Sequence, residues 1–179
     1  LQALLHTMVN MGVDCPVVVR VNYPDTDTEW LQVKAGADLG TILLNGFADG
    51  VWLEAPNYES QQKVVEYAFA ILQAARLRMS KTEFISCPSC GRTMFDLQTT
   101  VQQVKAATSH LTHLKIGVMG CVVNGPGEMA DADYGYVGAA RHSISLYKGK
   151  ECIERNVPET EAIPHLVALI KANGDWVDP

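Results

Sequence analysis

The sequence shows neither the long apolar runs that mark membrane proteins nor a visible signal peptide. No uninterrupted apolar stretch approaches the roughly 20 residues that a membrane helix requires, although 47% of the chain is hydrophobic. The amphipathic start, Leu1–Met11, has no basic region, no solid apolar stretch and no small-residue cleavage site, so it is not a signal peptide. We therefore expect no membrane partner.

Basic residues are scarce as well. The 179 residues include 14 Lys and Arg against 20 Asp and Glu, which gives a formal net charge of −6. We expect no nucleic-acid partner, because phosphate backbones bind surfaces that are rich in Lys and Arg. An anionic substrate must instead be bound by a local basic patch. Arg92 lies close in sequence to Cys87 and Cys90, so it is a candidate for binding an anion or for tuning a metal site at these cysteines.

Cysteine is present only five times, at Cys15, Cys87, Cys90, Cys121 and Cys152. An odd count without a secretory signal argues against a disulfide framework and favours a reducing compartment, so we expect a cytoplasmic protein. We expect Cys15 and Cys152 to be inert packing thiols, because free cysteine packs as a small hydrophobic residue. The chemistry then depends on the other three cysteines.

The chain begins inside an apolar helical pattern with no capping residue ahead of it. The residues that form this face are Leu1, Leu4, Leu5, Met8 and Val9. We therefore expect the chain to be a fragment of a longer protein, and part of the active site to lie outside it.

Strand and helix patterns alternate along the chain and predict an α/β protein. The first part has predicted strands at 16–21 and 50–54, and predicted helices at 33–47 and from Asn57, a candidate N-cap. This rhythm is typical of a parallel sheet or barrel. We place a domain boundary near Ser80, which divides the chain into 1–80 and 81–179.

The second part continues the alternation with more strands. Strands are predicted at 83–86, 115–119, 134–139, 143–147 and 151–155, and helices from Asp96 and Thr160, each a candidate N-cap. Pro164 is tolerable in the last helix because it lies in the first turn. Two of these strands run directly into loops that carry cysteine.

Cys87 and Cys90 are separated by two residues, a spacing that places two thiolates on one tight turn. Cys121 also follows an apolar strand. Because the carboxyl ends of neighbouring parallel strands lie together, the two loops can meet at one crevice. The glycine-rich run 124–128 (NGPGE) then permits a tight backbone path that brings the carboxylate of Glu128 back toward Cys121.

The pair Cys87 and Cys90 alone fits a zinc knuckle, so a zinc-stabilised structural or interaction module is the alternative interpretation. A pure electron-transfer protein would normally present four cysteines in the compact ferredoxin spacing, which this chain lacks. Oxygen is a harder ligand than thiolate, and iron releases it more readily. Three cysteines with Glu128 therefore favour a catalytic iron–sulfur site in which one iron can open to a substrate oxygen.

The runs 87–98 (CPSCGRTMFDLQ) and 120–133 (GCVVNGPGEMADAD) resemble the family of 4-hydroxy-3-methylbut-2-enyl diphosphate synthases of the methylerythritol phosphate pathway. The resemblance implies a [4Fe–4S] cluster held by Cys87, Cys90, Cys121 and Glu128. It also implies that 81–179 has a fold similar to the cluster modules of sulfite and nitrite reductases. The motif sequences are similar to those of the long, three-domain form of the family. In that form, residues 1–80 would be the last part of a barrel-like inserted domain.

The resemblance implies an oxidoreductase of isoprenoid biosynthesis. Its substrate would be 2-C-methyl-D-erythritol 2,4-cyclodiphosphate, opened and dehydrated to 4-hydroxy-3-methylbut-2-enyl diphosphate with two electrons from ferredoxin or flavodoxin. Glu128 would hold the unique iron at rest and give way to substrate, and Asn124 would donate a hydrogen bond to the leaving oxygen. The barrel that binds the diphosphate is missing, so the isolated chain is expected to be inactive. Whether the site forms within one chain or between the chains of a homodimer stays open.

Overall fold

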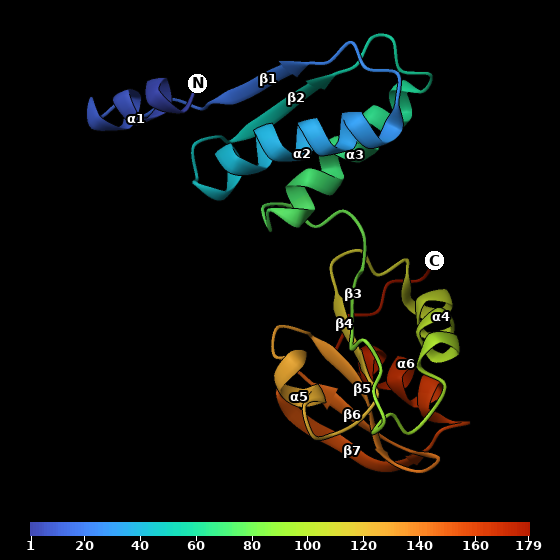
Figure 1. The fold of residues 1–179 in the computed structure, drawn as a ribbon. Helices are drawn as coiled ribbons and strands as arrows, with labels where there is room; N and C mark the ends of the chain where they lie inside the picture. The colour runs from blue at the N-terminus through green and yellow to red at the C-terminus, as the bar shows by residue number, and fades with distance from the viewer. The chain divides into compact units, whose positions relative to one another are not determined.

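The computed structural model describes all residues from Leu1 to Pro179, and it confirms the mixed α/β class. The chain forms two compact units, Leu1–Ser80 and Lys81–Pro179 (Figure 1). No helix in either unit combines the length and the hydropathy that crossing a bilayer demands.

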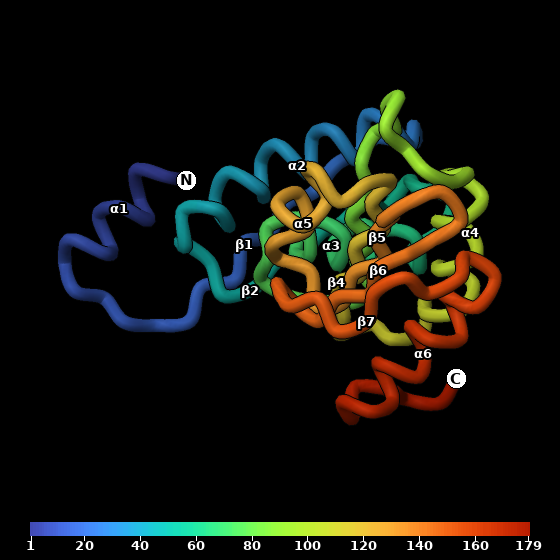
Figure 2. The backbone as a smooth tube through the Cα atoms, turned by 90° about the horizontal axis from the view of Figure 1, so that it is seen from below, coloured from blue at the N-terminus to red at the C-terminus, as the bar shows by residue number.

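The first unit contains a two-stranded parallel sheet and three helices. Its elements are α1 (Gln2–Asn10), β1 (Val18–Asn22), α2 (Thr28–Leu44), β2 (Gly50–Glu54) and α3 (Gln61–Ala74). Val19 lies opposite Val51 in the parallel pair, and both pack with apolar residues of α2 and α3 such as Leu39 and Leu72. Helix α1 lies beyond the amino-terminal end of β1 and buries only Leu5 (Figure 2).

The starts of these helices correct one sequence prediction. Asp27 caps α2, because its side chain accepts the Trp30 amide at 2.9 Å. The cap of α3 is Ser60, not Asn57. The Asn57 side chain instead donates to the Pro24 carbonyl at 3.2 Å, so a contact distant in sequence replaces the local cap.

The second unit is a five-stranded mixed sheet in the order β3-β4-β5-β6-β7. Its elements are β3 (Glu83–Ser86), α4 (Leu97–Thr108), β4 (Lys115–Met119), α5 (Gly125–Glu128), β5 (Tyr134–Ala140), β6 (Ser143–Lys148), β7 (Glu151–Pro158) and α6 (Ala162–Ala172). Strands β3, β4 and β5 run parallel, whereas β6 and β7 are added antiparallel. The parallel half therefore has its carboxyl ends at one edge of the sheet.

The two faces of this sheet are covered differently (Figure 1). Helices α4 and α6 lie over the larger core, which includes Val104, Ile116 and Leu166, all fully buried. The other face carries a smaller cluster that includes Met119 and Met129, beside the short helix α5. The larger core holds the sheet rigid, and the smaller one positions α5.

Local predictions for this unit are confirmed in part. Asp96 caps α4, because its carboxylate accepts the Thr99 amide at 3.2 Å. The prediction that Thr160 caps the last helix is wrong, since α6 begins after Glu161 and has no side-chain cap bond. Residues 125–128 form a short helix where the sequence predicted only a tight loop, and the Met129 amide closes it by donating to the Gly125 carbonyl at 3.0 Å.

Candidate functional site

Two loops that carry cysteine meet at the carboxyl edge of the parallel strands. Cys87 follows the last residue of β3, and Gly120 and Cys121 follow the last residue of β4. These strands are neighbours, with Ser86 opposite Val118. The loops touch directly, because the Gly120 amide donates to the Sγ atom of Cys87 at 3.3 Å. The crevice expected from the sequence is therefore present.

The structure places every sequence-predicted site residue on the wall of one cavity of about 160 Å³. These residues are Cys87, Cys90, Cys121, Asn124 and Glu128. Arg92, Thr93 and Gly120 line the same cavity. All of them come from the two loops and from α5, so one sheet edge supplies the whole site.

The three thiols differ in their access to solvent. Cys121 is buried, Cys87 is half-buried and Cys90 is exposed, and none forms a disulfide. Asn124 and Glu128 are also exposed. The cavity thus has a buried thiol at its base and polar side chains at its mouth.

The remaining two cysteines lie away from this cavity. Cys15 is exposed in the first unit, so the expectation that it is a packing thiol is wrong. Cys152 is half-buried on β7, where its thiol contacts the Glu154 carbonyl at 3.6 Å. Neither lines the cavity, which leaves three cysteines and one glutamate as its donors.

Arg92 acts on the exposed thiol. Hydrogen bonds from its backbone and then its side chain lower the pKa of Cys90, and its positive charge adds to the effect. A lowered pKa favours the thiolate, which is the form that binds metals. The basic residue predicted near the site therefore faces one of its candidate ligands.

Glycines allow α5 to approach the sheet. A Cβ atom on Gly125 would lie 2.7 Å from the Cβ atom of Met119, which is too close for any real side chain. A Cβ atom on Gly117 would lie 2.8 Å from that of Met129, and one on Gly135 would collide with the same side chain. Met129 therefore fills a hollow over two glycines of the sheet and fixes the position of its neighbour Glu128.

Sequence reasoning missed this anchor and also missed Thr93. Met129 is almost completely buried, but a lone methionine after a glycine-rich run does not reveal where its side chain packs. The glycines at 117 and 135 were the available indication, because glycine inside a strand often marks a close approach of another group.

The candidate donors all line the cavity. No group of three or more His, Cys, Asp or Glu side chains lies close enough together to hold a metal ion. A zinc ion requires its ligand atoms within about 2.0–2.3 Å of one centre.

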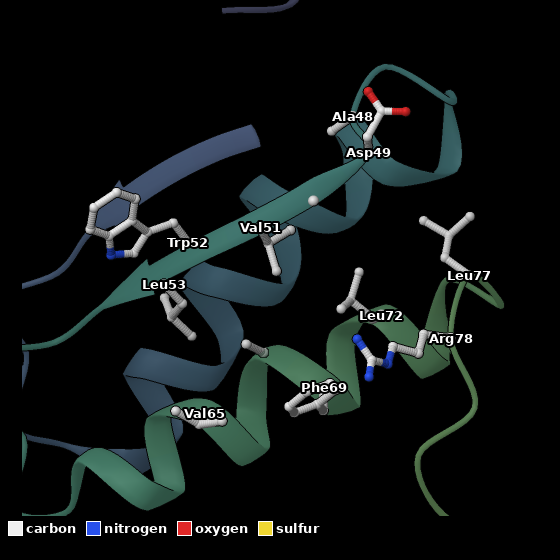
Figure 3. Close-up of a pocket in the computed structure, with 12 residues that line it drawn as sticks. Ala48, Asp49, Val51, Trp52, Leu53, Val65, Phe69, Leu72, Leu77 and Arg78 are labelled. Carbon is white, nitrogen blue, oxygen red and sulfur yellow. The ribbon is translucent and has the colours of Figure 1, made fainter. Parts of the chain in front are cut away.

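The first unit has a separate and wider groove of about 780 Å³ between β2 and α3 (Figure 3). Val51 and Leu53 point from the strand toward α3, which contributes Val65, Phe69 and Leu72. The groove contains none of the predicted site residues. Most of its lining residues are apolar.

Comparison with known proteins gives a consistent family. The model of the GcpE protein C-terminal domain matches residues 83–172. A 4-hydroxy-3-methylbut-2-en-1-yl diphosphate synthase (flavodoxin) of Parabacteroides distasonis is 59% identical over 179 residues, which are 99% of this chain and 29% of that protein. The enzyme of the same name from Phocaeicola vulgatus is 56% identical over 177 residues, again 99% of this chain and 29% of that protein.

A more distant relative extends the similarity. The protein of the same name from Chlorobaculum tepidum is 52% identical over 168 residues, which cover 94% of this chain and 22% of that protein. The chain therefore spans less than a third of the length of these curated relatives.

Proposed function

The chain belongs to the family of GcpE protein C-terminal domains, and from this premise we propose that it is the cluster-bearing part of a 4-hydroxy-3-methylbut-2-enyl diphosphate synthase. The whole enzyme would be an oxidoreductase of isoprenoid biosynthesis. It would open and dehydrate 2-C-methyl-D-erythritol 2,4-cyclodiphosphate by two-electron reduction. The relatives that cover this chain carry the same enzyme name, with flavodoxin as the stated donor.

One observation carries the proposal: three cysteines and one glutamate, from two loops far apart in sequence, line a single cavity. The donor set fits a [4Fe–4S] cluster, with thiolates from Cys87, Cys90 and Cys121 and a carboxylate from Glu128. When bound, such a cluster would supply stored electrons and Lewis-acid character. All four donors come from one chain, so a second subunit is not needed to complete the ligand set.

The chain's own residues prepare this site. The Gly120 amide donates a hydrogen bond to the Sγ atom of Cys87 at 3.3 Å. Hydrogen bonds from the backbone and side chain of Arg92 lower the pKa of Cys90. Both loops therefore supply a hydrogen-bond partner to a candidate ligand sulfur.

The two exposed polar residues at the cavity mouth have different roles. Glu128 is the last residue of α5. Its carboxylate is a hard oxygen ligand, which iron exchanges more readily than a thiolate. Asn124 precedes the same helix, and its side-chain amide can donate to the oxygen that leaves the substrate. Because both are exposed, a substrate delivered by the rest of the enzyme can reach them.

The partners follow from the same arrangement. The cyclic diphosphate would be held by the remainder of the longer protein, because this cavity is small and offers one Arg side chain. Flavodoxin, or ferredoxin of similar potential, would supply the electrons. Cys90 is exposed, which places one candidate ligand of the cluster at the surface where a donor protein can approach.

The second unit would correspond to the cluster modules of sulfite and nitrite reductases. Two of its three parallel strands, β3 and β4, end in the ligand loops, and α4 and α6 pack against the larger core of the sheet. This arrangement supports the assignment of 81–179 as the cluster domain.

The first unit would be the last part of a barrel-like inserted domain. Its strand–helix–strand–helix order and its parallel pairing fit a piece of such a barrel. Strand β2 has only one neighbour, and parallel sheets are normally covered on both faces and continued at their edges.

The groove beside β2 would accept a further parallel strand from the rest of the longer protein. Helix α3 extends apolar side chains over this edge, and Val65 remains 49% exposed there. The relatives are more than three times as long as this chain, so the rest of such a protein is long enough to supply a further strand. This occupant explains an apolar groove that would otherwise face water.

Anaerobic reconstitution of the full chain with iron and sulfide tests the cluster assignment. We expect about four iron and four sulfide per chain, as the cluster type requires. Cys87→Ser and Cys121→Ser should lose most of both, whereas the control Cys15→Ser should lose neither. A chain that binds zinc and no sulfide would support the structural zinc module instead.

A further inference from the structure

Thr93 lies where the two ligand loops meet, although it cannot bind iron as cysteine does. It is half-buried on the wall of the cavity, three residues after Cys90. Its contacts reach the Cys87–Cys90 turn on one side and Gly120 on the other.

The Thr93 hydroxyl closes the turn that holds the first two cysteines. Its Oγ1 atom accepts the Cys90 amide at 3.1 Å, and the Thr93 amide donates back to the Cys90 carbonyl at 3.0 Å. The Ser89 hydroxyl is 3.2 Å from the same Oγ1 atom. Ser89 has a positive φ of 65°, a backbone conformation that residues other than glycine rarely adopt. Hydrogen bonds from the surrounding loop stabilise it.

The same side chain occupies the space that a side chain at position 120 would need. A Cβ atom on Gly120 would lie 2.8 Å from the Oγ1 atom of Thr93 and 2.9 Å from its Cγ2 atom. The backbone of Gly120 is also engaged at both ends, since its carbonyl accepts the Met94 amide at 3.1 Å and its amide donates to Cys87. Gly120 therefore cannot move without moving the first loop.

We infer that Thr93 and Gly120 form a positioning pair that sets the separation between the Cys87–Cys90 turn and Cys121. Thr93 acts through its neighbours and touches no substrate. Its hydroxyl takes up the Cys90 amide, which would otherwise be free to donate to sulfur in the cavity. Hydrogen bonds to sulfur and the orientation of ligands tune the potential of such clusters. This inference rests on the proposed cluster, but the pair itself can be tested without one.

Thr93→Val and Thr93→Ser in the full chain separate the hydroxyl from the rest of the side chain. Valine keeps the shape and removes the acceptor, so hydrogen exchange of the Cys90 amide should accelerate about fivefold or more. Serine keeps the acceptor and should restore slow exchange. In the reconstituted chain, valine should also shift the midpoint potential and speed the loss of iron, and serine should rescue the potential.

A double-mutant cycle tests the contact between the two residues. Gly120→Ala alone should reduce iron and sulfide retention at least tenfold, because its methyl group has no space beside Thr93. Adding Thr93→Ala removes the two nearest atoms and should recover part of that loss, so the effects will not add. Additive losses, measured both as retention and as thermal unfolding of the metal-free chain, would overturn the pairing.

The outcomes separate this inference from the cluster assignment. If the unaltered chain binds no iron and sulfide, the proposed function fails. Hydrogen exchange of the Cys90 amide and the double-mutant cycle measured by thermal unfolding still test whether Thr93 and Gly120 act as a pair. If the cluster forms but Thr93→Val changes neither exchange nor potential, the positioning role fails alone.

Discussion

The amide of Gly120 donates to the Sγ atom of Cys87 at 3.3 Å, which joins the end of β4 to the end of β3. Both residues lie immediately beyond neighbouring parallel strands, so the sheet itself brings them together. The bond also fixes the orientation of the Cys87 thiol at the wall of the cavity. A contact that defines the fold at this edge thus also orients a candidate ligand.

Glu128→Cys should keep a cluster and lose activity. A thiolate can replace the carboxylate as a ligand, but it is exchanged less readily for a substrate oxygen. We expect normal iron and sulfide in the altered chain, and a large fall in kcat when the same change is made in the full-length enzyme. Full activity would contradict the exchange of this ligand, and Glu151→Cys on the exposed start of β7 is a matched control.

Met129→Ala should destabilise the second unit and loosen α5. The side chain is 1% exposed and fills the hollow over Gly117 and Gly135, so its removal leaves a cavity. The free energy of unfolding should fall by about 2–5 kcal/mol, measured by denaturant titration. Val123→Ala, at a position that is 64% exposed, should change it little. Equal effects of the two changes would show that Met129 is not an anchor.

Tyr136 should make the fold sensitive to alkaline pH. Burial, with a smaller contribution from the charge of Glu159, raises the pKa of this phenol to about 12. Because the folded pKa lies above the unfolded value of about 10, this contribution is fully present below pH 10 and is lost as the pH rises toward 12.

The pH dependence can be assigned to this residue by comparison. The difference in unfolding free energy between the unaltered chain and Tyr136→Phe should change by about 1–3 kcal/mol across that window. A constant difference would exclude Tyr136 as the group responsible, and Tyr23→Phe in the first unit is a control for a second tyrosine whose pKa is also raised.

Strand β2 should be protected in the full-length protein. Residues 50–54 have one neighbouring strand here, so a strand added at the free edge would bond further backbone groups. Hydrogen exchange of this segment should slow at least tenfold relative to the isolated chain, while the middle of α2 should change little. Equal exchange of β2 in both proteins would contradict a strand in the groove.

Several elements could be predicted from sequence because their causes are local. The strand over 115–119 and the cap at Asp96 depend on adjacent residues, and both agree with the structure. The predictions of caps at Asn57 and Thr160 are wrong, because side chains of similar chemistry compete within a few residues and distant contacts decide between them. The exposure of Cys15 is another property that the residues adjacent to it in sequence do not reveal.

The sequence by itself determined which side chains are available as metal ligands. It also determined that the two loops carrying the cysteines among them follow strands. Spacing of residue types along a chain is enough for that, since it depends on composition and local propensity. Only the tertiary structure decided that Thr93 fills the space at Gly120 and that Met129 covers Gly117 and Gly135. These contacts join segments separated by loops and helices, and close packing between such segments is settled only when the whole sheet forms.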